Sequence, residues 1–505
     1  MKIAERLRSI LAYTENPQIP FVYPVLLFFS AVTLRTFLEF FSDKAKILFT
    51  LFPPEQFIYY AQWVSFAISL MHYYLYWVAL SLAIGIILHC ITKEAPGKIL
   101  RTVFTFFILV SITPLFDLLS TRGAGHPIRY LYPTSISDFL LIPKGLTPGM
   151  FYTCSAAFGL SFLYCYAKTQ SWKKGLAGIL LTYALLLTTS VLPLLLGTRH
   201  PLPLIRVFFI AIVAQLIIIL YISNKNYLFS LVKDMRWMKY LYFQALFILG
   251  VLLSKSPPAA VIKGNLDAFL LTIVATTLCW CASIMFNNLS DCHLDAAGNP
   301  ELPLPSGKFP QGDSLRTARY VFLLALGCSL GVNFQTFFFV LLLLGNSLLY
   351  SLPPLRLKRV FIFSKLFPAL NSLATVMLGY IFAGGALLQF PAPLVWYFLI
   401  FATLIFNFLD IKDCEADKQR GIATLPVILG LSTAKLAIAG VCLIGYCMVS
   451  FIFLDLRLLF PTFFLGVVQF FFITRKNYSE KPVLVVHLSS VILLVLYLAF
   501  VRVPF

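Results

Sequence analysis

Long apolar stretches recur along the whole chain, separated by short polar segments. Most are close to the ~20 residues that an α-helix needs to cross a hydrocarbon core of ~30 Å. No stretch alternates apolar and polar residues as a transmembrane β-strand does. Within lipid, an α-helix forms all of its backbone hydrogen bonds within one segment, whereas a β-strand needs neighbouring strands. The pattern therefore predicts an all-α, polytopic transmembrane helical bundle.

About fifteen spans are expected, and a polar stretch at 224–239 separates the first six from the other nine. The first set is predicted at 19–41, 57–91 (one long helix or two), 99–119, 149–167, 175–197 and 204–222. The second set is predicted at 240–254, 266–286, 318–332, 334–350, 367–384, 393–409, 425–454, 458–474 and 483–502. We therefore predict an accessory transmembrane module of unknown role at 1–230 and a separate helical bundle at 231–505.

Composition supports a membrane protein and argues against a nucleic-acid partner. The 505 residues are 60% hydrophobic and 12% charged, whereas soluble domains carry roughly 25% charged residues. The formal net charge of +19 comes largely from Lys and Arg in short loops between spans, where topology and anionic lipid favour them. The ten cysteines are scattered, mostly inside apolar spans, and support neither a zinc site nor a disulfide framework.

Two acidic clusters follow apolar spans of the second module. Asn287, Asp291 and Asp295 are spaced i, i+4 and i+8, so a helix would align them on one stripe. In the second cluster, Asp410, Asp413 and Asp417 are spaced i, i+3 and i+7, and we expect them to share a helix face as well. Aligned carboxylates repel one another and are costly near lipid. A hard divalent cation such as Mg²⁺, which prefers oxygen ligands, would compensate them.

Both clusters are expected on the cytoplasmic side of the membrane, because four helices separate them and the flanking loops are basic. The loops on their side carry most of the second module's Lys and Arg, including Lys308, Arg316 and Arg475. Such an excess marks the cytoplasmic side. The sequence thus predicts an integral, multi-pass protein of a bacterial cytoplasmic membrane, with its acidic motifs facing the cytoplasm.

Three motifs together resemble those of the UbiA superfamily of intramembrane prenyltransferases. NNLSDCHLD at 287–295, followed by PLPSG, is similar to the first Asp-rich motif of that superfamily. DCEADKQRGIATLP at 413–426 resembles the second, and YSLPPLRLKR at 350–359 resembles the motif after the fourth helix. They occur in the family's order, after helices two, four and six of nine. The resemblance covers about residues 233–505.

The resemblance implies a nine-helix bundle whose cavity opens sideways to lipid, and a Mg²⁺-dependent enzyme. Its partners would be membrane lipid, a prenyl diphosphate and a lipophilic acceptor: a quinone or other aromatic precursor, a tetrapyrrole, or a glycerol-phosphate lipid. The implied catalytic metal ligands are Asp291, Asp295, Asp413 and Asp417, with Asn287 as an auxiliary ligand. The implied diphosphate contacts are Asn287, Arg356, Lys358, Arg359 and Lys418.

The sequence departs from the family pattern at two positions. Asn288 stands where an Asp is usual, and Leu302 stands where the loop usually has an Arg before Pro. Asn288 lies off the stripe of Asn287, Asp291 and Asp295, so we expect the metal site to persist.

Two other classes of protein compete with this interpretation. A non-catalytic lipid-binding or transport protein that keeps the fold would be expected to lose the four aspartates, which are present. An alcohol phosphotransferase would share Asp-rich helices but would not explain the motif at 350–359.

Overall fold

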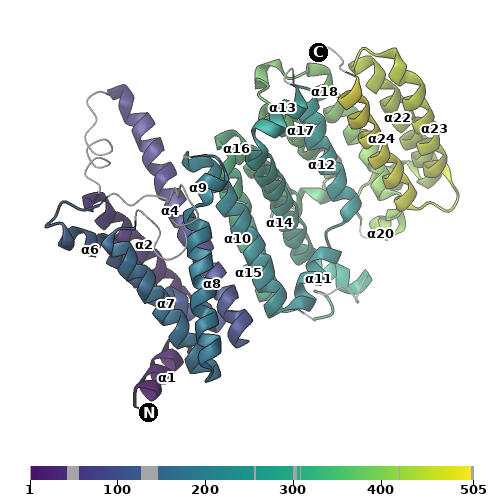
Figure 1. Ribbon diagram of the computed structural model, residues 1–505. Helices are drawn as coiled ribbons and strands as arrows, with labels where there is room; N and C mark the ends of the chain where they lie inside the picture. The colour runs from purple at the N-terminus through teal and green to yellow at the C-terminus, as the bar shows by residue number, and fades with distance from the viewer. Residues whose placement is uncertain are drawn as a thin grey trace. The chain divides into compact units, whose positions relative to one another are not determined.

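The computed structural model describes residues 2–42, 56–126, 146–198, 200–254, 257–298, 304–307, 309–419 and 421–501. Throughout these ranges the regular structure is helical, and no strand occurs in them. Thirteen of the described helical segments are long and apolar enough to cross a membrane. The chain divides into two compact units, Met1–Leu228 and Phe229–Phe505, whose helices are labelled in Figure 1. Separate roles for residues 1–230 and 231–505 stay a prediction.

The first unit is a helical bundle. Its elements are α1 (Lys2–Thr14), α2 (Val22–Ser42), α4 (Gln56–Thr92), α5 (Pro96–Phe106), η1 (Phe107–Ser111), α6 (Ile112–Ser120), α7 (Pro148–Thr169), α8 (Trp172–Ser190), α9 (Leu192–Leu195) and α10 (Pro201–Ser223), and α11 (Lys225–Lys233) leads into the second unit. Five described helices of the first unit (α2, α4, α7, α8 and α10) have 19 residues or more. Buried side chains of α2, α4, α5 and α10, including Phe28, Leu82, Phe104 and Phe208, form its core.

The structure decides between two alternatives at one predicted span of the first unit and changes another span. The stretch expected at 57–91 is one continuous helix, α4. The span expected at 175–197 stops at Ser190, and the chain restarts as the four-residue α9 with Pro193 in its first turn. Proline lacks a backbone N–H and is accommodated in the first turn of a helix rather than in its interior.

The second unit carries nine long helical segments among the described residues, one of them broken. The N-terminal elements are α12 (Trp237–Leu252), α13 (Pro258–Gly264), α14 (Leu266–Gly298), α15 (Gln311–Val332), α16 (Phe334–Ser351), η3 (Leu357–Arg359) and α17 (Phe363–Phe382). The broken segment is η4 (Leu387–Gln389), α18 (Ala392–Trp396), η5 (Tyr397–Ala402), α19 (Thr403–Ile405) and η6 (Phe406–Asp410). The C-terminal elements are α20 (Cys414–Gln419), α21 (Leu425–Leu429), α22 (Leu431–Ile452), η7 (Leu456–Leu458), α23 (Leu459–Thr474) and α24 (Glu480–Phe500).

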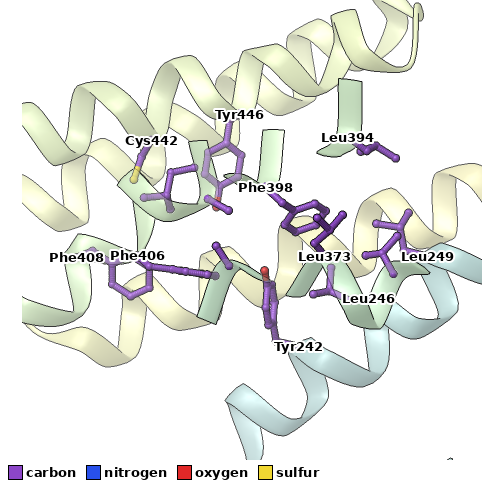
Figure 2. Packing of buried hydrophobic residues seen from close by; sticks show 14 of the residues in the cluster. Tyr242, Leu246, Leu249, Leu373, Leu394, Phe398, Phe406, Phe408, Cys442 and Tyr446 are labelled. Atoms are coloured by element: carbon purple, nitrogen blue, oxygen red, sulfur yellow. The ribbon is translucent and has the colours of Figure 1, made fainter. Parts of the chain in front are cut away.

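The core of the second unit lies between α12, α17, the broken segment and α22. Figure 2 shows Tyr242 and Leu246 of α12, Leu373 of α17, and Phe398 and Tyr446 among its labelled side chains. Each of these five residues is less than a tenth exposed. This packed cluster includes residues of the broken segment, such as Phe406 and Phe408, and so holds the segment that ends at Asp410 of the second acidic motif.

Helices α12 and α17 touch through their backbones. A Cβ atom added to Gly250 would lie 2.0 Å from the carbonyl oxygen of Val376, and one added to Gly379 would lie 2.0 Å from that of Phe247. Small residues at helix crossings in membranes permit such close approach. The two glycines therefore set the separation of these helices.

The segment that leads to the second acidic motif is not one regular helix. Residues Tyr397–Ala402 form a π-helical turn and Phe406–Asp410 form a 3₁₀ turn. The chain then turns through Ile411–Asp413 before α20 begins at Cys414. Asp410, Asp413 and Asp417 therefore do not lie on one continuous α-helix, which the spacing argument assumed. Their shared face stays a prediction.

Candidate active site

The first acidic motif lies on the last turns of α14, a single helix that continues to Gly298. The ammonium of Lys358 donates hydrogen bonds to Asp291 Oδ2 at 2.5 Å and to Asn287 Oδ1 at 3.1 Å. One cation thus bridges two residues spaced i, i+4, which places their side chains on the same face, as the spacing predicts.

Arg356 reaches the same carboxylate from the loop that follows α16. Its Nη2 donates to Asp291 Oδ1 at 2.6 Å and to the carbonyl oxygen of Ser290 at 3.1 Å. The backbone at Arg356 is left-handed, with φ of 44°, an uncommon conformation for a residue other than glycine. The loop therefore bends back onto the end of α14 and places two cations on one carboxylate.

Hydrogen bonds between α14 and α16 hold this arrangement in place. Ser290 Oγ donates to the carbonyl oxygen of Ser351 at 2.8 Å, and Ser351 Oγ donates to Asn287 Oδ1 at 3.2 Å. The amide oxygen of Asn287 thus accepts from both Ser351 and Lys358. The loop and both helix ends form one connected polar network.

Among the described residues, this network carries more positive than negative charge. Asp291 balances one of the two cations, and the side chains of Asp291, Arg356 and Lys358 are each less than a fifth exposed. Burial lowers the pKa of Lys358 below its usual range, and the adjacent Asp291 opposes that shift. Arg356 Nε is buried with no hydrogen-bond partner among the described residues. An anion with several acceptor oxygens would satisfy this donor and balance the excess charge.

The second acidic motif begins with another buried ion pair. Asp410 Oδ1 accepts from the ammonium of Lys365 on α17 at 2.5 Å. Asp410 Oδ2 is buried and has no partner within the described parts of the chain. The hydroxyl of Tyr350, at the end of α16, lies within electrostatic range of both Asp291 and Asp410. Tyr350 is therefore a residue on which both motifs act electrostatically.

The other predicted site residues are Asp295, Arg359, Asp413, Asp417 and Lys418, and Asp413 interacts electrostatically with Asp410. Asp413, Lys418 and Arg359 are exposed. Asp417 is partly buried in α20, and its backbone N–H donates to the carbonyl oxygen of Asp413 at 2.8 Å. The backbone of Asp295 belongs to α14, but its side chain lies outside the described residues.

No group of three or more His, Cys, Asp or Glu side chains within the described residues is placed to hold a metal ion. The metal-ligand roles of the four aspartates stay a prediction. Carboxylate and amide oxygens are nevertheless the ligand types that Mg²⁺ prefers. The unpartnered oxygen of Asp410 is a further candidate of that kind.

Three contributors to the site were not predicted from sequence. Lys365 was counted among ordinary loop cations, yet it pairs with Asp410. Ser351 carries no sequence signal beyond its position inside the motif at 350–359. Arg236 lies in the polar stretch before α12, and its Nη2 donates to Asn288 Oδ1 at 3.4 Å.

The fold and the site together define a multi-pass helical membrane protein with buried cations and carboxylates at adjoining helix ends. Residues 241–491 match the family model of the UbiA prenyltransferase family. A digeranylgeranylglyceryl phosphate synthase of Methanopyrus kandleri is 30% identical over 199 residues, which cover 38% of this chain and 67% of that protein. The chain belongs to the UbiA prenyltransferase family and is an enzyme of the prenyltransferase class.

Other curated relatives match over a smaller share of their length. The bacteriochlorophyll synthase 33 kDa chain of Cereibacter sphaeroides is 34% identical over 168 residues, which cover 30% of this chain and 51% of that protein. A homogentisate phytyltransferase of Synechocystis is 31% identical over 155 residues, which cover 28% of this chain and 49% of that protein. The chain therefore spans about half of these two relatives.

Solved structures of a UbiA homologue from Archaeoglobus fulgidus are also similar. The structure bound to dimethylallyl diphosphate and Mg²⁺ is 18% identical and has a TM-score of 0.44, and it covers 54% of this chain and 98% of its own. The structure bound to geranyl diphosphate and Mg²⁺ has the same identity and coverage and a TM-score of 0.45.

Proposed function

We propose that this protein transfers an isoprenyl group from a prenyl diphosphate to a lipophilic acceptor within the membrane, in a Mg²⁺-dependent reaction. The observation that carries the proposal is the double pairing of Asp291 with Arg356 and Lys358 at the end of α14. It gathers one carboxylate and two cations beside an amide oxygen, on a chain that belongs to a prenyltransferase family.

The proposed reaction begins with ionisation of the allylic C–O bond, which leaves negative charge on the diphosphate. Arg356 and Lys358 would bind this diphosphate and stabilise the developing charge, because fixed cations in a water-poor site act strongly. Arg359 and Lys418 are proposed as additional contacts. Arg356 Nε has no hydrogen-bond partner among the described residues. It would therefore donate to the diphosphate without breaking an existing hydrogen bond.

The proposed ligands for Mg²⁺ are Asp291, Asp295, Asp413 and Asp417, with Asn287 as an auxiliary ligand. A bound Mg²⁺ would supply Lewis-acid stabilisation of the diphosphate oxygens. The carboxylate of Asp410 has one buried oxygen without a partner in the described structure, so it extends the set of candidate oxygen ligands. Tyr350 lies near both acidic motifs and would position their carboxylates relative to each other.

For the acceptor, we propose a chemical class, that of lipophilic nucleophiles. The names of the relatives include a digeranylgeranylglyceryl phosphate synthase, a bacteriochlorophyll synthase and a homogentisate phytyltransferase. They match the classes of acceptor expected from the resemblance, and no residue of the site selects among them. We further propose that the site faces the cytoplasm, because basic residues cluster in the flanking loops.

The test is release of diphosphate from geranylgeranyl or farnesyl diphosphate by the purified full-length protein, with and without Mg²⁺. Asp291→Asn and Asp413→Asn should each lower the Mg²⁺-dependent rate by at least about 100-fold, the scale of losing one preorganised charge contact. Asp313→Asn is the matched control, because Asp313 is exposed on α15 and pairs only with nearby Arg316 among the ion pairs described. Undiminished turnover in both site variants would reject the assignment.

A non-catalytic lipid-binding or transport role is the alternative. It would be supported if the folded wild-type protein bound a prenyl diphosphate but released no diphosphate with any acceptor offered.

A further inference from the structure

The first unit contains a large, partly open cavity. Its volume is about 760 Å³, and its walls come from α1, α2, α4, α5, η1, α6, α7 and α8. Ligand-binding pockets typically measure roughly 300–1,000 Å³ and are mostly apolar with a few polar groups. Most of the wall here is apolar, with Leu80, Ile84, Phe106 and Leu160 among the lining residues. The cavity therefore has the size and lining of a site for a small lipophilic molecule.

A buried charge lies at one side of this cavity. Arg35 is 4% exposed and belongs to the predicted membrane span Val22–Glu39. Its Nη1 donates to Glu39 Oε2 at 2.6 Å, and its guanidinium carbon lies 4.9 Å from the ring of Trp77. Ionisable residues inside a membrane are costly, and they usually mark functional sites. A residue that served only packing would not require this charge.

Two hydrogen-bond donors at this side of the cavity have no partners among the described residues. Arg35 Nε and Trp77 Nε1 are both buried, and neither has an acceptor among the described residues. Both side chains line the cavity. Guanidinium and indole N–H groups donate and cannot accept, so a ligand that satisfies them must present an acceptor oxygen.

The charge balance favours an uncharged acceptor. Glu39 already offsets the charge of Arg35, so a carboxylate or phosphate would bring an uncompensated negative charge into an apolar cavity, which is costly. The same wall carries the rings of Tyr73, Tyr76 and Trp77. Flat aromatic faces pack well against a second ring system.

We propose that the first unit binds an uncharged, ring-bearing lipophile whose carbonyl oxygen accepts hydrogen bonds from Arg35 and Trp77. Quinones and aryl ketones are the chemical class that fits. The site lies entirely within the first unit and is distinct from the prenyltransferase site, so the inference does not depend on the proposed transfer reaction.

Benzophenone is a suitable probe because it is an uncharged aryl ketone that, on illumination, inserts into nearby C–H bonds. The purified full-length protein in phosphatidylcholine nanodiscs would be photolabelled and its peptides mapped. We expect the label to concentrate on the cavity-facing residues of α4, α5 and α7, and to be competed by 2-methyl-1,4-naphthoquinone but not by palmitate. Labelling spread evenly over lipid-facing helices, or competition by palmitate alone, would overturn the proposal.

Two variants test separately the hydrogen bond from Trp77 and the space available for a ligand in the cavity. Trp77→Phe keeps the ring but removes the N–H donor, and it should weaken the apparent affinity of the naphthoquinone about fivefold, the scale of one hydrogen bond. Ala157→Phe places a ring in the cavity lining and should abolish competable labelling.

Trp172→Phe and Ala184→Phe are the matched controls, because both residues are exposed and lie outside the cavity lining. They should leave labelling unchanged. Equal labelling of Trp77→Phe, Ala157→Phe and the controls would overturn the proposal even if one variant were poorly folded.

Discussion

At the scale of single residues, the site depends on cations that are both buried and paired. Lys358 is held by Asp291 and Asn287, and Arg356 is held by Asp291 and a backbone carbonyl. Burial penalises charge on Lys358, as its lowered pKa indicates. A basic group whose pKa is lowered loses its proton at a lower pH than an exposed lysine.

The proposed role of Lys358 therefore predicts a pH dependence. As pH rises through the lowered pKa of Lys358, its positive charge disappears and KM for the prenyl diphosphate should increase. Arginine stays protonated in this range, so Lys358→Arg should flatten the alkaline rise in KM. The measurement is the KM for geranylgeranyl diphosphate between pH 7 and 10, with the exposed Lys481→Arg as control. An identical alkaline rise in wild type and Lys358→Arg would exclude this role.

The pair of Lys365 and Asp410 gives a prediction about stability. Asp410→Asn leaves a largely buried ammonium without its counter-charge, which should lower the free energy of unfolding by about 3–5 kcal/mol. The double variant Lys365→Met with Asp410→Leu removes both charges and should lose much less. Thermal unfolding in detergent, followed with a thiol-reactive dye, would compare them. Equal losses in the single and double variants would show that the pair is not the cause.

The residues of the first motif were predictable because their geometry is local. Asn287 and Asp291 lie one helical turn apart, and any helix through them brings both to the same side. The ion pair between Lys365 and Asp410 joins positions 45 residues apart, and its formation depends on the packing of α17 against the broken segment. The spacing of residues along the sequence does not show which distant residues form such a contact.

At the scale of helices, the length of the hydrophobic stretches identified most membrane spans, but it did not identify the interruptions within them. Helix α14 extends beyond the span expected at 266–286 because the polar motif continues the helix past the apolar core. The segment expected at 393–409 contains a π turn and a 3₁₀ turn, and the hydrophobic length that predicts a span does not distinguish these turns from a regular α-helix. Since the second motif follows these turns, its geometry could not be predicted from residue spacing.

The crossing of α12 and α17 provides a test of helix packing. Gly379→Ala would place a methyl group 2.0 Å from the carbonyl oxygen of Phe247, so the helices must separate. Overpacking costs about 1–3 kcal/mol or more, and we expect a lower midpoint of thermal unfolding together with reduced turnover. Gly440→Ala on α22 is the control, because nothing lies within 4 Å of an added Cβ there. Equal midpoints for the two variants would contradict the close contact.

At the scale of the whole molecule, the two units carry separate chemical features. The motifs at 287–295, 350–359 and 410–418 belong to the second unit, and the cavity beside Arg35 belongs to the first. We therefore expect residues 229–505, expressed alone in membranes, to retain Mg²⁺-dependent release of diphosphate within about threefold of the full chain, a change below 1 kcal/mol. Loss of turnover in a folded truncation would show that the first unit completes the active site.

The two cations on Asp291 have a consequence for the order of ligand binding. Without other ligands, this carboxylate occupies the same donors that the diphosphate would use. If Asp291 ligates Mg²⁺ as proposed, metal uptake withdraws it from Arg356 and Lys358 and leaves both cations available. Thermodynamic reciprocity then requires each ligand to tighten the other by the same factor, typically about 5- to 150-fold. Titrations of a non-ionisable thiolodiphosphate analogue at several Mg²⁺ concentrations should show this cooperativity, and Asp291→Asn should weaken it.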